Sequence, residues 1–318
     1  MKNLIVLYFS LSIFLSCKED QNNFAIQSSR GKLLEILVVA DTSEMDHVKN
    51  ILLPLFNENY DYLPQREAKY SLKFISLQAF LANSEYLLFH NTLFINQNER
   101  FGLRTNLQYA KAINKWANPQ LLQFVKLDGK INETLFVVKN EIELQNLNLF
   151  KSRTELWKID TLLKFANQPF IYPIYFEKQN LKDSSIYLYK HEFKDGVECI
   201  LLQKTKMKPN KLDLIKWRNQ IFEKYFSGSD SSIIVHDKII KPDFVSLNGQ
   251  YLKYSLKGLW ETKADFKGGP FVTYIFYDQN NQEYLLADSF VFCPGKGKKN
   301  YVEELKLIIL GAFEKTYQ

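Results

Sequence analysis

The sequence has little of what usually marks a metal-binding or catalytic protein. It holds three cysteines and four histidines among 318 residues, with no CxxC pair and no cluster of the two types. A structural zinc site needs such ligands grouped closely, so we expect no metal site, and no motif indicates a cofactor. Glu192, Glu198 and Glu261 are acidic but form no distinctive pair, and a Ser–His–Asp triad is recognised only by geometry. The catalytic residues are therefore unknown at this level.

The N-terminal apolar stretch is too short to cross a bilayer, which takes about 20 residues. It runs from Leu4 to Leu15 behind Lys2 and fits the apolar part of a secretory signal. Ser16 and Cys17 follow, and a small residue before cysteine is what lipoprotein processing requires. We expect residues 1–16 to be a lipoprotein signal peptide and Cys17 to carry acyl chains such as palmitate. The alternative is a plain secreted protein in which Cys17 is incidental.

The residues after Cys17 bear on where the protein would be held. Lys18, Glu19 and Asp20 resemble the export tag that sends lipoproteins of Bacteroidota to the outer face of the outer membrane. The alternative is an ordinary hydrophilic tether. Residues 17–31 contain few apolar groups, so we expect a lipidated flexible stalk. We expect a lipid-anchored outer-membrane protein, with the surface-exposed and periplasmic faces both left open.

The amino-acid composition limits the classes of molecule that the protein is expected to bind. The formal charge of +6 is spread along the chain and favours an anionic partner only weakly, and an envelope protein has no nucleic acid to bind. Aromatic residues make up 15% of the chain, which suits a carbohydrate-binding surface, although most should fill the core. We expect Cys199 and Cys293 to be buried thiols; a disulfide, which needs Cα atoms within about 7 Å, is the alternative.

The apolar periodicity predicts the order of elements. Strands are expected at 33–40, 72–75, 86–95, 121–127, 170–176, 185–189, 197–204, 251–260, 271–277 and 283–292. Helices are expected at 44–56, 133–163 with a break near 151–152, 209–226 and 301–315, with a helical turn at 109–119.

This order predicts the fold class α+β. Two similar β-α-β-β-β-α units, 32–168 and 169–318, would each place helices on a mostly antiparallel sheet. The boundary is placed at Asn167-Gln168-Pro169. A single continuous sheet with a coincidental order is the alternative.

Several motifs carry a family resemblance. They are Gly258-Leu259-Trp260-Glu261, Asp265 to Val272, Phe290-Val291-Phe292 with Pro294, and Trp116 to Gln120. With the lipoprotein signal and the early apolar strand, they resemble a family of Bacteroidota lipoproteins, the domain of unknown function 4837 type. The resemblance covers nearly the whole mature chain and implies no catalytic residues. Lys267 departs from it, because methionine is expected there.

Gly268-Gly269-Pro270 is the sharpest local feature. Two glycines let the backbone approach a neighbour closely, and proline fixes the exit. A ligand could lie against this bare backbone, with Trp260 and Phe266 as walls. The alternative is a tight connection between two strands.

A second candidate lies in the loop before the last helix. Lys296 and Lys298 precede that helix, whose N-terminal N–H groups attract anions. The spacing does not match a phosphate-binding loop, and a solvated loop is the alternative.

Three functions are open. We expect a non-enzymatic binding or scaffolding protein whose partner is an envelope protein or a glycan. The alternative is an envelope hydrolase near Trp260 and Gly268–Gly269, which predicts a concave pocket holding a carboxylate or histidine. A structural subunit of an envelope complex would instead expose a large apolar patch.

Overall fold

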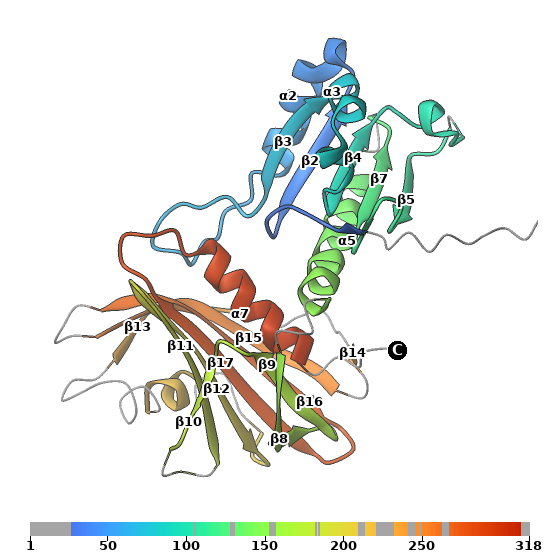
Figure 1. Ribbon diagram of the computed structural model, residues 1–318. Coiled ribbons are helices and arrows are strands. Elements are labelled where there is room, and N and C mark those ends of the chain that lie inside the picture. Colours follow the sequence, from blue (N-terminus) through green and yellow to red (C-terminus); the bar gives the residue numbers. More distant parts are fainter. Residues whose placement is uncertain are drawn as a thin grey trace, which may run out of the picture.

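The described residues of the computed structural model form two large sheets, each with its own hydrophobic core, and two small two-stranded sheets (Figure 1). It describes residues 27–104, 106–127, 131–152, 157–181, 183, 185–208, 214–220, 232–240, 246–247, 250–262 and 267–312. The expected signal peptide, Cys17, Lys18, Glu19, Asp20 and Phe266 lie outside the described residues, so the predictions made for them stay predictions.

The first unit is a five-stranded sheet with the order β3-β2-β4-β7-β5. The strands are β2 (Glu35–Ala40), β3 (Ser71–Ser76), β4 (Asn91–Ile95), β5 (Tyr109–Ile113) and β7 (Leu121–Val125). Only β5 runs antiparallel to its neighbour; the other three pairings are parallel. Because helices cover both faces of a parallel sheet, its central strands are continuously apolar, as β2 is.

Helices lie on both faces of this first sheet. α2 (Met45–Leu55) and α5 (Ile131–Lys151) pack on one face, and α3 (Leu77–Ala82) packs on the other beside α4 (Ser84–Leu87). Shorter elements complete the unit: η1 (Thr42–Glu44), η2 (Glu99–Phe101), and the paired β1 (Gln27–Ser28) and β6 (Ala117–Asn118).

The second unit is an antiparallel sheet with the order β10-β11-β12-β17-β16-β15-β13. The strands are β10 (Glu177–Gln179), β11 (Ile186–Phe193), β12 (Gly196–Thr205), β13 (Ser232–Ile240), β14 (Ser246–Leu247, beside β15), β15 (Gln250–Thr262), β16 (Gly268–Asp278) and β17 (Glu283–Phe292). α7 (Lys299–Ala312) and the hairpin β8 (Trp157–Phe165)–β9 (Gln168–Pro173) share its main core. Figure 1 shows α7 on the side of this sheet that faces the first unit.

The α+β class is confirmed, but the two units are not alike. The first sheet is mostly parallel and covered on both faces, whereas the second is antiparallel. The similar order of helices and strands expected for the two units does not imply similar strand directions, because apolar periodicity does not encode whether two strands pair parallel or antiparallel.

Local differences from the prediction have physical causes. Residues 109–113 form β5 and not a helical turn, because pairing with β7 overrides the local composition. The break after residue 151 is confirmed, but 157–165 then form β8 and not more helix. Asn167 lies in the turn of the β8–β9 hairpin, where Ala166 and Asn167 both have positive φ, as a two-residue hairpin turn requires.

The first unit reaches into the core of the second. Tyr60, Tyr62 and Leu63, in the connection between α2 and β3, belong to the core cluster formed around α7. In the same connection, the Glu67 carboxylate accepts hydrogen bonds from the backbone N–H groups of Lys298 (2.7 Å) and Lys299 (3.0 Å). A carboxylate at a helix N-terminus accepts hydrogen bonds from the free N–H groups and interacts favourably with the helix dipole. Glu67 of the first unit therefore caps the N-terminus of α7.

A cluster of charges joins the two units farther along α7. The Lys306 ammonium lies 3.3 Å from Glu143 of α5 and 3.5 Å from Glu303 of α7. Glu143 also pairs with Lys69 at 2.5 Å and accepts a bond from the Tyr70 hydroxyl at 3.2 Å. Burial alone would raise the pKa of Glu143, but Lys306 and Lys69 lower it to about 2, so this carboxylate is ionised near neutral pH.

None of the helices in the described part of the chain is long and apolar enough to span a membrane.

Lys306→Met tests the charge cluster. It leaves two carboxylates without their shared cation, so we expect the free energy of unfolding to fall by about 3–5 kcal/mol in denaturant titrations. Lys111→Met is the matched control, because Lys111 pairs with Glu141 at 2.7 Å but is 41% exposed. That variant should lose less than about 1 kcal/mol. An equal loss of unfolding free energy in the two variants would show that the buried cluster stabilises the fold no more than an exposed ion pair does.

Candidate functional site

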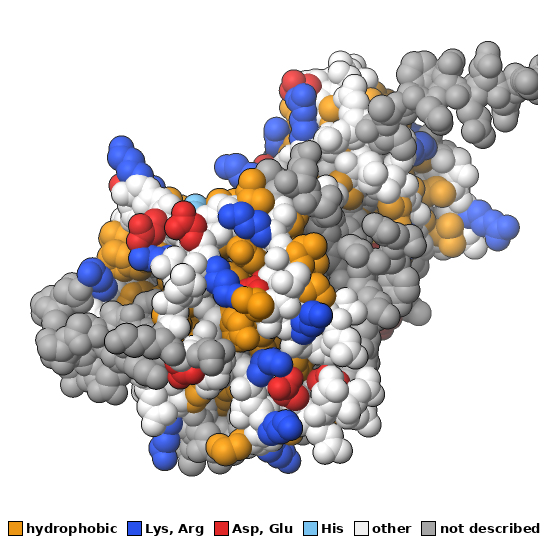
Figure 2. All heavy atoms as spheres, turned by 60° about the horizontal axis from the view of Figure 1, so that its bottom comes forward, with side chains coloured by type: hydrophobic (Ala, Val, Ile, Leu, Met, Phe, Trp, Pro, Cys, Tyr) orange, Lys and Arg blue, Asp and Glu red, His pale blue; other side chains and the backbone are white. Residues whose placement is uncertain are grey.

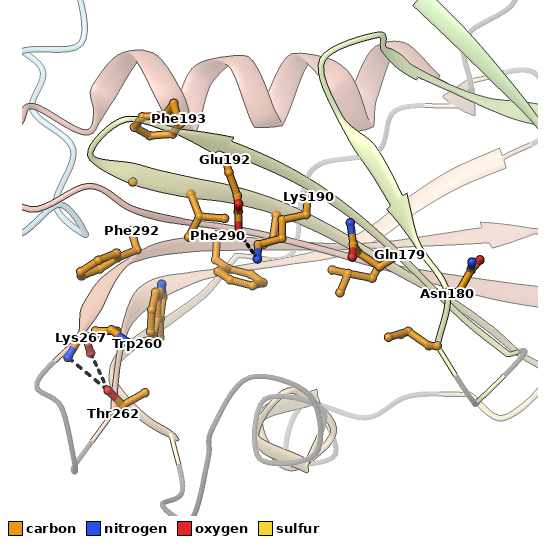
Figure 3. A pocket seen from close by; sticks show the side chains of 15 residues that line it. Gln179, Asn180, Lys190, Glu192, Phe193, Trp260, Thr262, Lys267, Phe290 and Phe292 are labelled. Atoms are coloured by element: carbon orange, nitrogen blue, oxygen red, sulfur yellow. Dashed lines mark hydrogen bonds and ion pairs between the residues drawn. The ribbon is translucent and has the colours of Figure 1, made fainter.

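A cavity of about 660 Å³ lies on the face of the second sheet that points away from α7. Figure 2 shows the molecule turned so that its lower side comes forward, with hydrophobic side chains gathered between lysines and acidic groups. Figure 3 shows the lining close up, with α7 on the opposite side of the strands. The lining comes from β10, β11, β12, β15 and β17, together with Lys267 just before β16.

Strand alternation places the lining residues. Lys190 and Glu192 on β11 lie two residues apart and therefore project to the same face. Their register partners on β12 are Cys199 and Val197, which pair in turn with Phe290 and Phe292 on β17. Two rows of side chains thus cross the sheet side by side, each from a charged residue to an aromatic one.

Trp260 lines the cavity, and the two glycines are its neighbours on the next strand, β16. Gly268 and Gly269 are the first residues of β16 and pair with Glu261 and Trp260, so they lie within a strand and not in a connection between two strands. An ideal Cβ at residue 269 would lie 1.9 Å from the Val291 carbonyl oxygen and 3.4 Å from Trp260 Nε1. Glycine is therefore what lets β16 approach β17 beside the indole ring.

Aromatic rings make the floor of the cavity. The ring centroid of Trp260 lies 5.7 Å from that of Phe290 at an interplanar angle of 78°, and 6.4 Å from that of Phe292. Trp260 and Phe290 are only 6% and 3% exposed, whereas Phe292 and Phe193 are half-buried. The buried pair fixes the shape of the floor, and Phe292 offers aromatic surface to a ligand, whereas the Phe193 ring lies on the α7 side of the sheet and stacks on Tyr301 at a centroid distance of 5.1 Å.

Polar groups line the rim. Lys190 and Glu192 form an ion pair, and the hydrogen bond from Lys190 holds the pKa of Glu192 below its usual value. Gln179 and Asn180 bring side-chain amides from β10 and the residue after it. At the far end, the Thr262 hydroxyl accepts a bond from the Lys267 backbone N–H at 3.1 Å. The rim therefore offers both hydrogen-bond donors and acceptors.

A buried ion pair holds the helical residues 214–220 to the same face of the sheet. The Arg218 guanidinium lies 3.1 Å from Asp288 of β17 and 3.7 Å from the centre of the Phe271 ring. The Thr273 hydroxyl donates to the same carboxylate at 2.5 Å. Both charges are almost fully buried, so this contact fixes the helical segment beside the cavity.

The described lining of the cavity holds no evident nucleophile with a base. Glu192 is its one carboxylate, and that group is already paired with Lys190. Burial raises the pKa of the Cys199 thiol, which keeps it protonated and unreactive. Cys199 and Cys293 are both free, as predicted. Within the described residues, no group of three or more His, Cys, Asp or Glu side chains is placed to hold a metal ion.

The His191–Glu198 pair lies on the α7 side of the sheet, outside the cavity. His191 Nδ1 is 2.9 Å from Glu198 Oε2, and rings of Tyr175 and Phe176 lie against the imidazole. Burial raises the pKa of Glu198 to about 7, although the bond to His191 opposes that rise. Its Oε1 atom is buried and has no hydrogen-bond partner among the described residues.

Lys296 and Lys298 do not line the cavity. Lys296 pairs with Asp195 at 2.7 Å, which raises its pKa, and the Lys298 ammonium donates to the Lys296 carbonyl at 2.5 Å. The helix N–H groups expected to attract an anion already donate to Glu67. The protein's own carboxylate therefore takes the position that the anion-binding hypothesis gave to an external anion.

The sequence pointed to Trp260 and the glycine pair but missed most of the lining. Gln179, Asn180, Lys190 and Phe292 come from strands that meet Trp260 only through the register of the sheet. Alternating apolar and charged residues along 186–192 were the available signal, and they indicate a half-buried strand without naming its neighbours.

Comparison with known families divides the chain between its two sheets. Residues 158–310 match the model of a domain of unknown function (DUF4837), and residues 29–159 match that of another domain of unknown function (DUF8532). No curated protein matches the chain. The match to the DUF4837 model is thus as expected, but it covers residues 158–310 and not nearly the whole mature chain, and residues 29–159 are similar to a different family.

The Glu198 carboxyl predicts a pH dependence of stability. Because its folded pKa is raised, its contribution to stability is fully present below about pH 4.5 and is lost as pH rises through about 7. The loss is of the order of 3 kcal/mol. Glu198→Gln should therefore lose less free energy of unfolding than the wild type between pH 5 and pH 7.5 in urea titrations. Glu177→Gln, at an exposed site on β10, should follow the wild type. Parallel pH profiles for all three proteins would contradict the assignment.

Proposed function

We propose that this chain is a lipid-anchored envelope protein that binds a glycan in the cavity of its second sheet, without chemical turnover. The observation that carries the proposal is the make-up of the cavity, where the aromatic floor of Trp260, Phe290 and half-buried Phe292 lies beside amides and a charged pair. Sugar rings present apolar C–H faces and hydroxyl edges, so they pair with aromatic surface and with hydrogen-bonding side chains together. A volume of about 660 Å³ lies within the range of small-ligand sites.

The absence of an assembled catalytic pair in the described lining supports binding over hydrolysis. Hydrolysis of a glycosidic bond commonly uses two carboxyl groups facing one another across the substrate. The described lining supplies one, Glu192, and Lys190 neutralises it.

A hydrolase is the second candidate. It predicted a concave pocket near Trp260 that holds a carboxylate, and the cavity contains both Trp260 and Glu192. This observation keeps Glu192 as the residue to change in a test of turnover.

The proposed anchor agrees with the place of the first described residues. β1 (Gln27–Ser28) lies beside β6 in the first unit. Cys17 precedes Gln27 by ten residues (27 − 17), which span at most roughly 35 Å when fully extended. An acylated Cys17 would therefore keep the first unit close to the membrane and leave the second unit free to meet a ligand.

Glycan binding can be tested with the whole chain purified with a Cys17→Ala change. Soluble peptidoglycan fragments and oligosaccharides from lipopolysaccharide are titrated by calorimetry. We expect saturable binding that weakens at least about tenfold, or ~1.4 kcal/mol, when Gln179 and Lys190 are both changed to Ala. Lys158→Ala, an exposed lysine on β8 outside the cavity, is the control and should leave the Kd unchanged.

Two results would reject this function. Binding that ignores the Gln179 and Lys190 changes would place the ligand elsewhere. Release of smaller sugars from the fragments, lost on Glu192→Gln, would assign the cavity to a hydrolase.

Anchoring is tested separately in cells. The wild type should sediment with membranes and shift in mass by its acyl chains, whereas Cys17→Ala should be soluble and unmodified. Protease treatment of intact cells then reports which face of the outer membrane carries the protein. A wild-type protein found soluble and without acyl chains would refute the anchor while leaving the glycan-binding proposal untouched.

A further inference from the structure

A second, polar cavity of about 220 Å³ adjoins the aromatic cavity of about 660 Å³ on the second sheet. It is lined by Tyr175, Glu177, Gln179, Lys190 and Glu192, and the last three of these also line the aromatic cavity. The two cavities therefore share a wall. The polar cavity is smaller than the roughly 300–1,000 Å³ of complete small-ligand sites, so it fits better as an extension of its neighbour than as a site of its own.

Strand pairing explains why the two cavities adjoin. Glu177 of β10 pairs with Lys190 of β11, and Gln179 lies two residues farther along β10, so the three side chains project from the same face of the sheet. Tyr175 comes just before β10, and its ring packs against His191 at a centroid distance of 4.7 Å. Because His191 lies on the α7 side, the polar cavity leads from the aromatic cavity to the edge of the sheet.

The polar cavity offers hydrogen bonds and no aliphatic surface. Glu177 is exposed, and its carboxylate forms no ion pair with a described residue, so both oxygens can accept bonds from a ligand. The Gln179 amide donates one bond to the Glu177 carbonyl at 3.3 Å, which leaves a second hydrogen and the amide oxygen. Hydroxyl groups find partners here, whereas a hydrocarbon chain finds none.

The shared wall is the Lys190–Glu192 ion pair (Figure 3). The side chains of Lys190 and Glu192 are 36% and 70% exposed, so the top of the wall is open to water. Water competes for exposed ion pairs, and such pairs hold their partners weakly. A ligand can therefore pass over this pair and exchange its own hydroxyl groups for part of the contact.

We propose that the polar cavity is a second sugar position of the same site, so that the ligand is a glycan strand of several sugars and not a single terminal sugar. One unit would lie on the aromatic floor at Phe292, and the strand would cross the Lys190–Glu192 pair to place a later unit at Glu177 and Gln179. This inference rests on the glycan-binding function proposed above. A short glycan would fill the aromatic cavity and leave the polar one empty.

Chain length is the test. The whole chain with Cys17→Ala is titrated by calorimetry with two series: peptidoglycan glycan strands of two, four and eight sugars, and lipopolysaccharide O-chains of one, two and four repeats. We expect the Kd in at least one series to fall at least tenfold from the shortest member to the longest. Either series supports the proposal, and the series that binds identifies the source of the strand.

Three variants separate the two positions. Glu177→Leu changes only the polar cavity, so it should remove most of the gain with length and leave the Kd of the shortest glycan unchanged. Phe292→Ala changes only the aromatic cavity and should weaken short and long glycans by the same factor. Glu133→Leu, at an exposed position of α5 that lines neither cavity, is the matched control and should bind as the wild type does. Thermal unfolding checks that each variant remains folded.

Failure of this inference is distinct from failure of the proposed function. Saturable binding with a Kd that does not depend on length would overturn the second position and leave glycan binding in place. A gain with length that persists in Glu177→Leu would likewise place the added contacts outside the polar cavity. No binding of any member of either series would reject both proposals.

Discussion

The structure depends on α7 being shared by the two units. Glu67 of the first unit accepts hydrogen bonds from the N–H groups at the start of α7. In the middle of the helix, the Lys306 ammonium pairs with Glu143 of α5 and with Glu303 of α7 itself. If the units separated, Glu143 would keep Lys69 and Lys306 would keep Glu303, but the Glu143–Lys306 pair and the bonds from the first N–H groups of α7 to Glu67 would be lost. The helix is thus part of both units, although it packs on the sheet of the second.

The covering of one face by α7 determines what the other face can do. In the second sheet, Ile200, Leu202 and Val291 point to the α7 core, while their neighbours Cys199, Leu201 and Phe290 point the other way. The first set closes a core that needs no ligand. The second set is only partly covered by the helical residues 214–220, and the remainder is the cavity with its aromatic floor. The alternation of side chains along each strand therefore separates the face that forms the α7 core from the face that lines the cavity.

The fold was predictable where a single segment carries its own signal. The strand at 283–292 and the helix 44–56 follow from local periodicity, and the structure has them as β17 and α2 with little change of bounds. Residues 109–113 and 157–165 were misassigned because their strand state is set by distant partners, β7 and β9. The site shows the same limit. Trp260 and the glycine pair stand out in the sequence, but Lys190 and Glu192 join them through the register of five strands, and no local pattern encodes that register.

Gly269 has a consequence for how the sequences of relatives can vary. The Val291 carbonyl stands where any Cβ at this position would be, so the obstacle is backbone and cannot rotate away as a side chain could. Trp260, Phe290 and Phe292 could each be exchanged for another ring while the pairing of β15, β16 and β17 persisted. Glycine at 269 could not, as long as β16 keeps its distance from β17. Among distant relatives, this glycine would thus be a better marker of the same strand register than the aromatic residues that shape the cavity.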